Sequence, residues 1–162
     1  MNKLQSRIKI GVVILLALFV VFGCKKSEEL YSPVKEALMI RAWVDDMVKN
    51  KYVVDSTATG VYYVIEKVGT GSNVQAGNNI TVAYTGKFLD GTAFDASSSY
   101  AYIHKASNQR MIPGWEEGIE KLSRGGIGVF LIPSAQAYGP NGYLVVPPYT
   151  PLFFRIEIIS IQ

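Results

Sequence analysis

The sequence VAYTGKFLDGTAFD, residues 82–95, decides the fold of this chain. Its first part is rich in the β-branched and aromatic residues that are typical of a strand. Asp90-Gly91 then supplies residues that favour a tight turn, and a second extended segment follows that ends in Phe94-Asp95. The stretch therefore predicts a strand, a tight turn and a second edge that ends in Phe94-Asp95.

Similar short segments, separated by glycines, continue through the chain from residue 56 onward. We expect strands at 60–68, 79–87, 99–104, 126–133 and 151–161. Between the third and fourth of these, Trp115, Ile119 and Leu122 recur at helical spacing, which predicts a short helix over 114–122. Strands with one short helix indicate the α+β class, in which an antiparallel sheet buries one face against the helix.

A second helix is predicted ahead of the strands. Ser32 is a good N-cap and Pro33 suits the first helical position, where a missing N–H costs nothing. An apolar stripe then follows at three- and four-residue spacing, made of Ala37, Ile40, Trp43, Val44 and Met47, and it ends near residue 50. Such a stripe needs a partner surface, which is either the flank of the following domain or a second copy of the chain.

The first 23 residues are predicted to be an export signal. Lys3, Arg7 and Lys9 form a positive segment, and residues 10–22 form an apolar run. This run is shorter than the roughly 18 to 20 residues that span a bilayer. Three of the 16 Lys and Arg residues of the chain lie within residues 1–23, so the remainder holds 13 basic against 13 acidic side chains. That balance favours neither nucleic acid nor an acidic substrate as partner.

The run ends in VFGC, residues 21–24, which resembles the lipobox of bacterial lipoproteins and implies that Cys24 carries a lipid. The alternative is a short hydrophobic anchor with an incidental cysteine. We therefore expect a signal peptide at 1–23, a lipidated tether and helix at 24–55, and a folded domain at 56–162. The expected location is the envelope of a Gram-negative-type bacterium, on the periplasmic side of the outer membrane. The acidic segment 26–29 leaves the cell surface as an alternative.

Three stretches of the folded part resemble the FKBP-type peptidyl-prolyl cis–trans isomerases. They are residues 82–95, MIPGWEEGI at 111–119, and AYG at 137–139 followed by VVPP at 145–148 and LFF at 152–154. The resemblance implies a five-stranded antiparallel half-barrel wrapped around the short helix, with a substrate groove between them. It also implies rotation of X–Pro bonds in polypeptide clients, with no cofactor and no metal.

The resemblance also implies a set of site residues. The catalytic positions are Tyr84, Phe94, Asp95, Trp115, Tyr138 and Phe154, and the substrate-binding positions are Met111, Ile112, Val146 and Tyr102. Trp115 would lie beneath the proline ring. The Ile112 N–H and the Tyr138 hydroxyl would bond substrate carbonyls, and Asp95 would hold Tyr84 or polarise the twisted amide. Tyr102 is favoured for the pocket over Tyr100 and His104.

This chemistry needs no nucleophile, metal or proton relay. The X–Pro amide rotates over a barrier of roughly 18 to 20 kcal/mol, and a water-poor aromatic pocket that binds the twisted amide best lowers it. His104 is the only histidine and is expected to be an ordinary strand residue. Two other hypotheses remain open: a module that binds a proline-containing segment without turnover, and a structural lipoprotein that uses the fold as a spacer.

Overall fold

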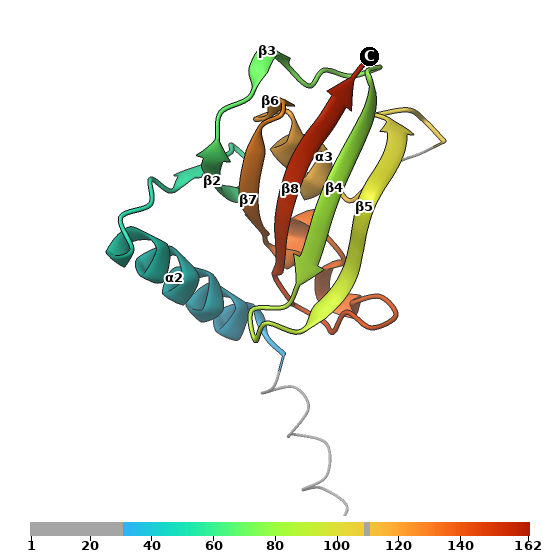
Figure 1. Ribbon diagram of the computed structural model, residues 1–162. Helices are drawn as coiled ribbons and strands as arrows, with labels where there is room; N and C mark the ends of the chain where they lie inside the picture. The colour runs from blue at the N-terminus through green and yellow to red at the C-terminus, as the bar shows by residue number, and fades with distance from the viewer. Residues whose placement is uncertain (1–30, 109–110) are drawn as a thin grey trace, which may run out of the picture.

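The five predicted strands lie side by side in one antiparallel sheet (Figure 1). The computed structural model describes residues 31–108 and 111–162, so the predicted signal segment and Cys24 lie outside the described residues. The sheet order is β1 (Asp55–Ser56), β2 (Tyr62–Lys67), β7 (Ile127–Ile132), β8 (Leu152–Ile161), β4 (Asn79–Lys87) and β5 (Ala93–Ile103). A separate ribbon pairs β3 (Thr70–Asn73) with β6 (Ser123–Arg124).

The sheet differs from the prediction at both edges. It has six strands because the two-residue strand β1 pairs with β2, and two residues are too few to give a sequence pattern. At the other edge, β5 begins at Ala93 and not at 99. Its first half is mostly exposed and rich in serine, so it carries no apolar alternation, yet its backbone pairs with β4 from Lys87 back to Asn79.

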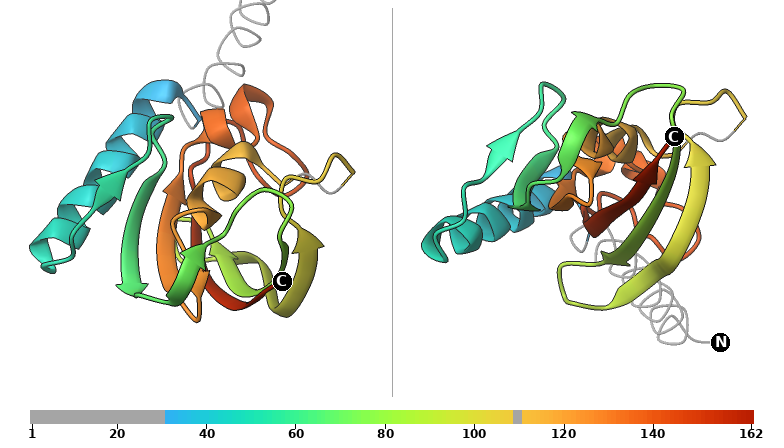
Figure 2. Two further views of the ribbon diagram at one scale, coloured as in Figure 1. Left: turned by 90° about the horizontal axis from the view of Figure 1, so that it is seen from above. Right: turned by 45° about the horizontal axis from the view of Figure 1, so that its top comes forward.

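The sheet curves around the short helix α3 (Pro113–Ile119), as Figure 2 shows. Trp115, Ile119 and Leu122 are all but inaccessible to solvent, and they pack in one core with side chains of β4, β7 and β8. The burial pattern of β8 alternates along most of its length, since one face of the sheet looks toward α3. This half-barrel around one helix is the fold that the sequence predicted.

Helix α2 (Pro33–Lys49) lies outside the half-barrel on the side of β2 (Figure 1). The Ser32 side chain accepts the Lys35 N–H, as expected of the N-cap. Of the predicted stripe, all but Ala37 is partly buried, while Ala37 is exposed and its neighbour Glu36 is buried. The apolar stripe of α2 is therefore partly covered by the same chain, and Glu36 takes the buried position that was predicted for Ala37.

The buried Glu36 carboxylate ties α2 to the domain. One oxygen accepts the Ser134 N–H, and the other accepts the Ser134 hydroxyl at 2.7 Å. Ser134 begins the 3-10 turn η1 (Ser134–Gln136), which leads directly to Ala137 and Tyr138. A helix that precedes the domain in sequence thus holds a segment next to the predicted site.

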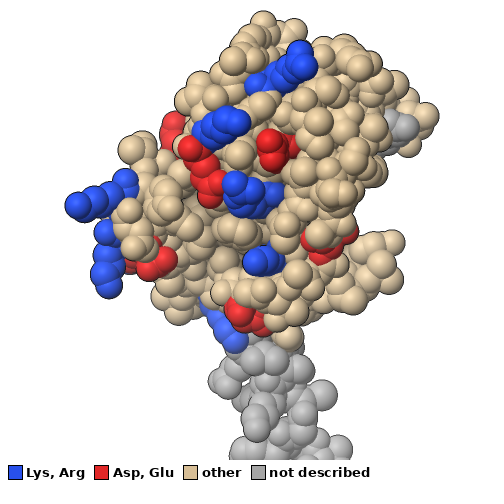
Figure 3. All heavy atoms as spheres, in the orientation of Figure 1, with Lys and Arg blue, Asp and Glu red and all other residues tan. Residues whose placement is uncertain are grey.

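The face of the molecule in Figure 3 mixes charges of both signs. Lysine and arginine side chains alternate there with aspartate and glutamate, without a large patch of one sign. Within residues 31–108 and 111–162, no helix is long and apolar enough to cross a bilayer.

Replacing Glu36 by alanine should lower the free energy of unfolding by about 2 to 3 kcal/mol, because two hydrogen bonds to a buried carboxylate are lost. Asp45→Ala on the same helix is the matched control, since Asp45 is exposed and pairs with Arg41 only at 3.9 Å. That variant should stay within about 0.5 kcal/mol of wild type. Urea denaturation measures both, and equal losses would contradict the tie between α2 and η1.

Candidate active site

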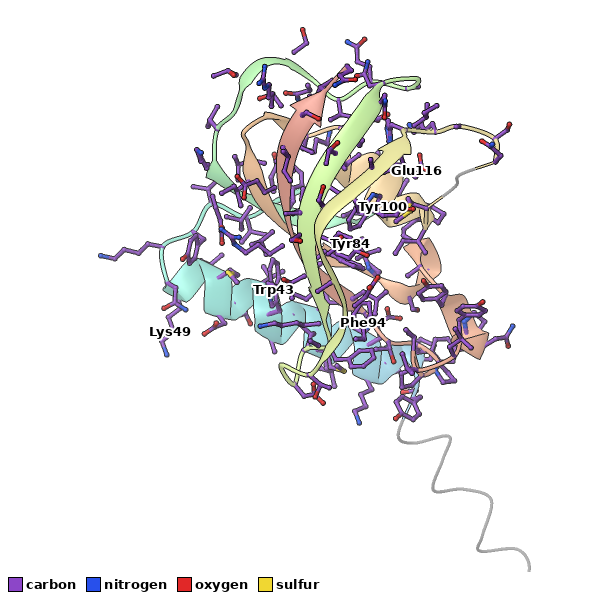
Figure 4. All side chains as sticks on the ribbon, turned by 45° about the vertical axis from the view of Figure 1, so that its right-hand side comes forward. Trp43, Lys49, Tyr84, Phe94, Tyr100 and Glu116 are labelled. Atoms are coloured by element: carbon purple, nitrogen blue, oxygen red, sulfur yellow. The ribbon has the colours of Figure 1, made fainter. Side chains whose placement is uncertain are left out.

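A cavity of about 410 Å³ opens between the end of the half-barrel and α3. Its lining residues are Tyr84, Phe94, Asp95, Met111, Ile112, Pro113, Trp115, Ala137, Tyr138 and Phe154. The lining contains all six residues predicted as catalytic and two of the four predicted as substrate-binding. Strands β4, β5 and β8, the start of α3 and the turn after η1 each contribute to it. Figure 4 shows Tyr84 and Phe94 on the neighbouring strands β4 and β5.

Trp115 lies at the base of the cavity and is held there from several sides. Only 1% of its surface is exposed. The rings of Tyr84 and Phe154 meet it edge to face, at centroid distances of 5.1 and 5.2 Å. Its indole N–H donates to the Tyr102 hydroxyl at 2.7 Å. The indole therefore has one fixed orientation, and a ligand would meet a preformed aromatic surface.

Tyr102 and Val146 were predicted to line the pocket, but neither is among the residues that line the cavity. Tyr102 is 3% exposed and lies behind Trp115, whose indole it holds. Val146 is buried in the core at the base of the loop that carries Tyr143, with which it exchanges two backbone hydrogen bonds. Both residues support the cavity wall from behind, because their side chains point into the core.

Phe94 and Phe154 form a second aromatic wall over Gly86. Their rings meet edge to face at 5.5 Å. Gly86 of β4 pairs with Asp95 on one side and with Phe154 on the other, and a Cβ atom on it would lie 2.8 Å from both rings. Glycine is therefore required here by the close approach of two rings. The prediction missed Gly86, and only the strand register could have revealed it.

Gly114 and Gly118 bring α3 close to the sheet. A Cβ on Gly114 would lie 2.3 Å from the Ile132 side chain, and one on Gly118 would lie 2.8 Å from the Phe130 ring. In the structure they serve the packing of α3 on β7, which sets the depth at which Trp115 lies.

The polar groups of the cavity lie at its rim. The Tyr84 hydroxyl donates to Asp95 at 2.8 Å, one of the two roles considered for this aspartate. Burial raises the pKa of the Tyr84 phenol, and the hydrogen bond to Asp95 raises it further by a smaller amount. Burial and the nearby Asp95 charge likewise raise the pKa of Tyr138. Both phenols therefore stay protonated at neutral pH. Because the Tyr84 proton is donated to Asp95, the Tyr138 hydroxyl is the one of the two that can donate to a ligand.

Two groups of the cavity are available to a peptide ligand, the Ile112 backbone and the Tyr138 side chain. The Ile112 carbonyl accepts the Trp115 and Glu116 N–H groups, whereas the Ile112 N–H meets no acceptor among the residues that the structure describes. The Tyr138 ring stacks on Tyr143 at 5.4 Å and is part of the lining. An apolar cavity with donors at its rim suits an apolar ring flanked by carbonyl groups, which is the character of an X–Pro segment.

The fold and this cavity together define a class of small α+β domains with an aromatic pocket beneath one helix. Residues 70–159 match the family model described as FKBP-type peptidyl-prolyl cis-trans isomerase. That match spans more than half of the chain, so the chain belongs to the FKBP-type peptidyl-prolyl cis-trans isomerase family.

Relatives of known sequence agree with this assignment. The chain is 37% identical over 109 residues to the FKBP-type peptidyl-prolyl cis-trans isomerase FkpA of Aeromonas hydrophila, with 67% of this chain and 41% of the relative covered. It is 30% identical over 109 residues to FkpA of Escherichia coli K12, with 67% and 40% covered. The chain thus spans about two fifths of the length of these relatives.

Solved structures show the same fold. The crystal structure of FkpA from Escherichia coli matches with a TM-score of 0.72 at 23% identity, and the match covers all of this chain and 74% of that one. A peptidyl-prolyl cis-trans isomerase from Pseudomonas syringae matches with a TM-score of 0.63 at 29% identity, covering 78% of this chain and 95% of that one.

The bond from Trp115 to Tyr102 has a consequence at high pH. Burial raises the pKa of the Tyr102 phenol, against a smaller opposing effect of the indole hydrogen bond. The folded chain thus keeps a proton that the unfolded chain releases near pH 10, so the stability this proton confers is lost as pH rises above about 10.

We expect Tyr102→Phe to cost about 1 to 3 kcal/mol of unfolding free energy at pH 7, since a buried indole N–H loses its acceptor. The same variant should show a shallower loss of stability between pH 9 and 11. The exposed Tyr52 provides the control Tyr52→Phe, which should change neither quantity. Denaturation at several pH values tests this, and an unchanged alkaline slope in Tyr102→Phe would contradict it.

Proposed function

We propose that this chain is a peptidyl-prolyl cis–trans isomerase that rotates X–Pro bonds in cell-envelope proteins. The observation that carries the proposal is the preformed aromatic cavity, with Trp115 fixed at its base and donors at its rim. Membership of the family and the names of the relatives support it.

The cavity suits the electronic change that accompanies rotation of the amide. As an X–Pro amide twists it loses resonance, so its carbonyl carries less charge and depends less on water than the planar form does. A pocket lined mainly by rings therefore binds the twisted form better than the flat one, and this difference in binding accelerates the reaction. Each 1.36 kcal/mol of preference is worth about a factor of ten in rate.

The lining residues divide into two roles in this proposal. Trp115, Phe94 and Phe154 accept the proline ring, while Met111 lines the side of the pocket. The Ile112 N–H and the Tyr138 hydroxyl hold the carbonyls that flank the bond. Asp95 orients Tyr84 through the hydrogen bond of 2.8 Å, so it acts on the substrate through the position of that ring.

Phe94→Ala and Asp95→Asn should each lower kcat/KM on a short Xaa-Pro peptide, Phe94→Ala by about tenfold or more, because each removes part of the preference for the twisted amide. A protease-coupled assay measures the rates. Asp90→Asn is the charge-matched control, since Asp90 lies in the turn after β4 and bonds only within that turn.

Wild-type rates in both Phe94→Ala and Asp95→Asn would contradict catalysis at this cavity. Peptide binding that persists without any acceleration would instead favour the alternative, a module that holds proline segments of a partner. Unfolding curves of each variant separate loss of activity from loss of fold.

We propose further that Cys24 carries a lipid and holds the enzyme in the envelope of a Gram-negative bacterium. The lipobox-like segment 21–24 supports the lipid, and the organisms of the relatives support the envelope. Cys24→Ser should move the chain from the membrane fraction to the soluble fraction or leave it uncleaved. Unchanged fractionation with radiolabelled lipid still attached would contradict the assignment.

We also propose a homodimer through the outer face of α2. Val34, Leu38 and Val48 remain 71%, 63% and 57% exposed on this helix, although the predicted stripe is partly covered. Sedimentation of the lipid-free chain should give a dimer that Leu38→Glu dissociates, and a monomer at all concentrations would contradict it.

A further inference from the structure

A buried cluster of charged groups lies beside the cavity, where β5 ends against α3. His104 is fully buried, and its two ring nitrogens point at two glutamates of the α3 segment. Nε2 is 3.0 Å from Glu120 Oε1, and Nδ1 is 3.5 Å from Glu116 Oε2. The backbone of His104 is fixed by hydrogen bonds with Gly77 and Asn78. Figure 4 places Glu116 farther along the half-barrel than Tyr84 and Phe94.

The contact with Glu120 defines one side of the imidazole. Burial alone would raise the pKa of Glu120, but hydrogen bonds from Lys105 and His104 hold it below its usual value. Glu120 is therefore a carboxylate at neutral pH and can only accept hydrogen bonds. Its contact at 3.0 Å consequently requires a proton on Nε2 of His104.

The other side of the imidazole is then incomplete. In a neutral ring with its proton on Nε2, Nδ1 carries a lone pair, and this lone pair faces Oε2 of Glu116. Both atoms are buried, and neither has a hydrogen-bond partner within the described part of the chain. Two buried acceptors in this arrangement repel each other, whereas a single additional proton between them satisfies both.

Glu116 connects this cluster to the cavity. Its second oxygen, Oε1, accepts the Met111 N–H at 3.0 Å. Met111 and Ile112 line the cavity, and the Ile112 N–H, which meets no acceptor among residues 31–108 and 111–162, is one of the donors at its rim. The carboxylate that holds Met111 is therefore the same one that faces His104.

We propose that His104 is a positioning residue of the isomerase, which holds a proton on Nδ1 and so fixes Glu116 against the Met111 backbone. The protonated ring lies between the carboxylates of Glu116 and Glu120. Lys105 contacts Glu120 at 2.7 Å, and the Tyr102 ring lies 6.4 Å from the imidazole. A hollow of about 540 Å³, lined by Lys105, Glu116 and Glu120 among others, lies beside the cluster.

Loss of this proton at higher pH has a defined effect. The Nδ1 lone pair then repels Glu116 Oε2, so Glu116 turns away and releases the Met111 N–H. The Ile112 donor loses its fixed position, and catalysis declines as pH rises. The proposal rests on the proposed isomerase function for its kinetic part only, because the protonation of His104 can be observed without any substrate.

The direct test uses the fact that the chain has a single histidine. In a ¹⁵N-labelled sample at pH 7, both imidazole nitrogens should show a one-bond coupling to hydrogen. A ring that carries hydrogen on Nε2 alone at this pH would overturn the proposal, whether or not the chain is an active isomerase. In Glu116→Gln the side-chain amide can donate to Nδ1, so that ring should carry hydrogen on Nε2 alone.

The kinetic test compares pH profiles of kcat/KM between pH 6 and 9. The wild type should lose activity toward high pH, by about tenfold as the Met111 contact is lost. Glu116→Gln should keep a flat profile, since its amide serves Met111 and His104 at once without titrating. Glu117→Gln on the same helix is the control and should retain the wild-type profile, because Glu117 bonds instead to the Thr59 hydroxyl.

An identical decline in wild type and Glu116→Gln would overturn the positioning role of the pair. Absence of isomerisation at every pH would overturn the proposed function, while the NMR result would still decide the protonation of His104. His104→Phe adds a third measurement, because it should raise KM about tenfold at pH 7 by leaving Glu116 Oε2 buried without a partner.

Discussion

The close approach of α3 to β7 is the constraint on which the cavity depends. Gly114 and Gly118 allow this approach, since a side chain at either position would collide with Ile132 or Phe130. The approach sets the depth of Trp115, and the hydrogen bond to Tyr102 fixes its orientation. The remaining rings of the cavity then pack against an indole whose place is already determined.

The polar contacts outside the cavity hold the segments that form its rim. Glu36 of α2 bonds to Ser134 and so steadies the chain just before Tyr138. Glu116 bonds to Met111 and steadies the chain just before Ile112. Both glutamates are buried, and neither is among the residues that line the cavity. Each therefore acts on the site through the backbone segment that it holds.

Much of this organisation could be predicted from the sequence. The strands with strong apolar patterns, such as 79–87, were placed correctly because the core imposes its periodicity on them. The helix that carries Trp115 was also found, although it ends at Ile119 and not at 122. One of the two roles expected of Asp95 was to hold Tyr84, and the structure contains that contact. An edge that ends in Phe94-Asp95 was expected, but its continuation through the following serines as one strand, β5, was missed because these exposed residues carry no pattern of burial.

The other misses concern residues that act through long-range packing. Tyr102 was predicted to line the pocket, but in the structure it lies behind Trp115. The spacing of residues along the strand cannot distinguish a side chain that lines the pocket from one that lies behind it. The buried Glu36 takes the position predicted for Ala37 at the start of the apolar stripe, and its contact with Ser134 explains this. His104 was expected to be an ordinary strand residue, whereas its environment depends on Glu116 and Glu120 of the α3 segment, which periodicity does not bring next to it.

The central claim is that the aromatic cavity receives the proline ring of an X–Pro segment and favours its twisted amide. Exchange NMR on an Ala-Pro peptide with a catalytic amount of the chain tests this most directly. The account predicts faster exchange between cis and trans signals, together with nuclear Overhauser contacts from the proline ring to the Trp115 indole. Unaccelerated exchange, or proline contacts only to residues outside the cavity, would contradict it.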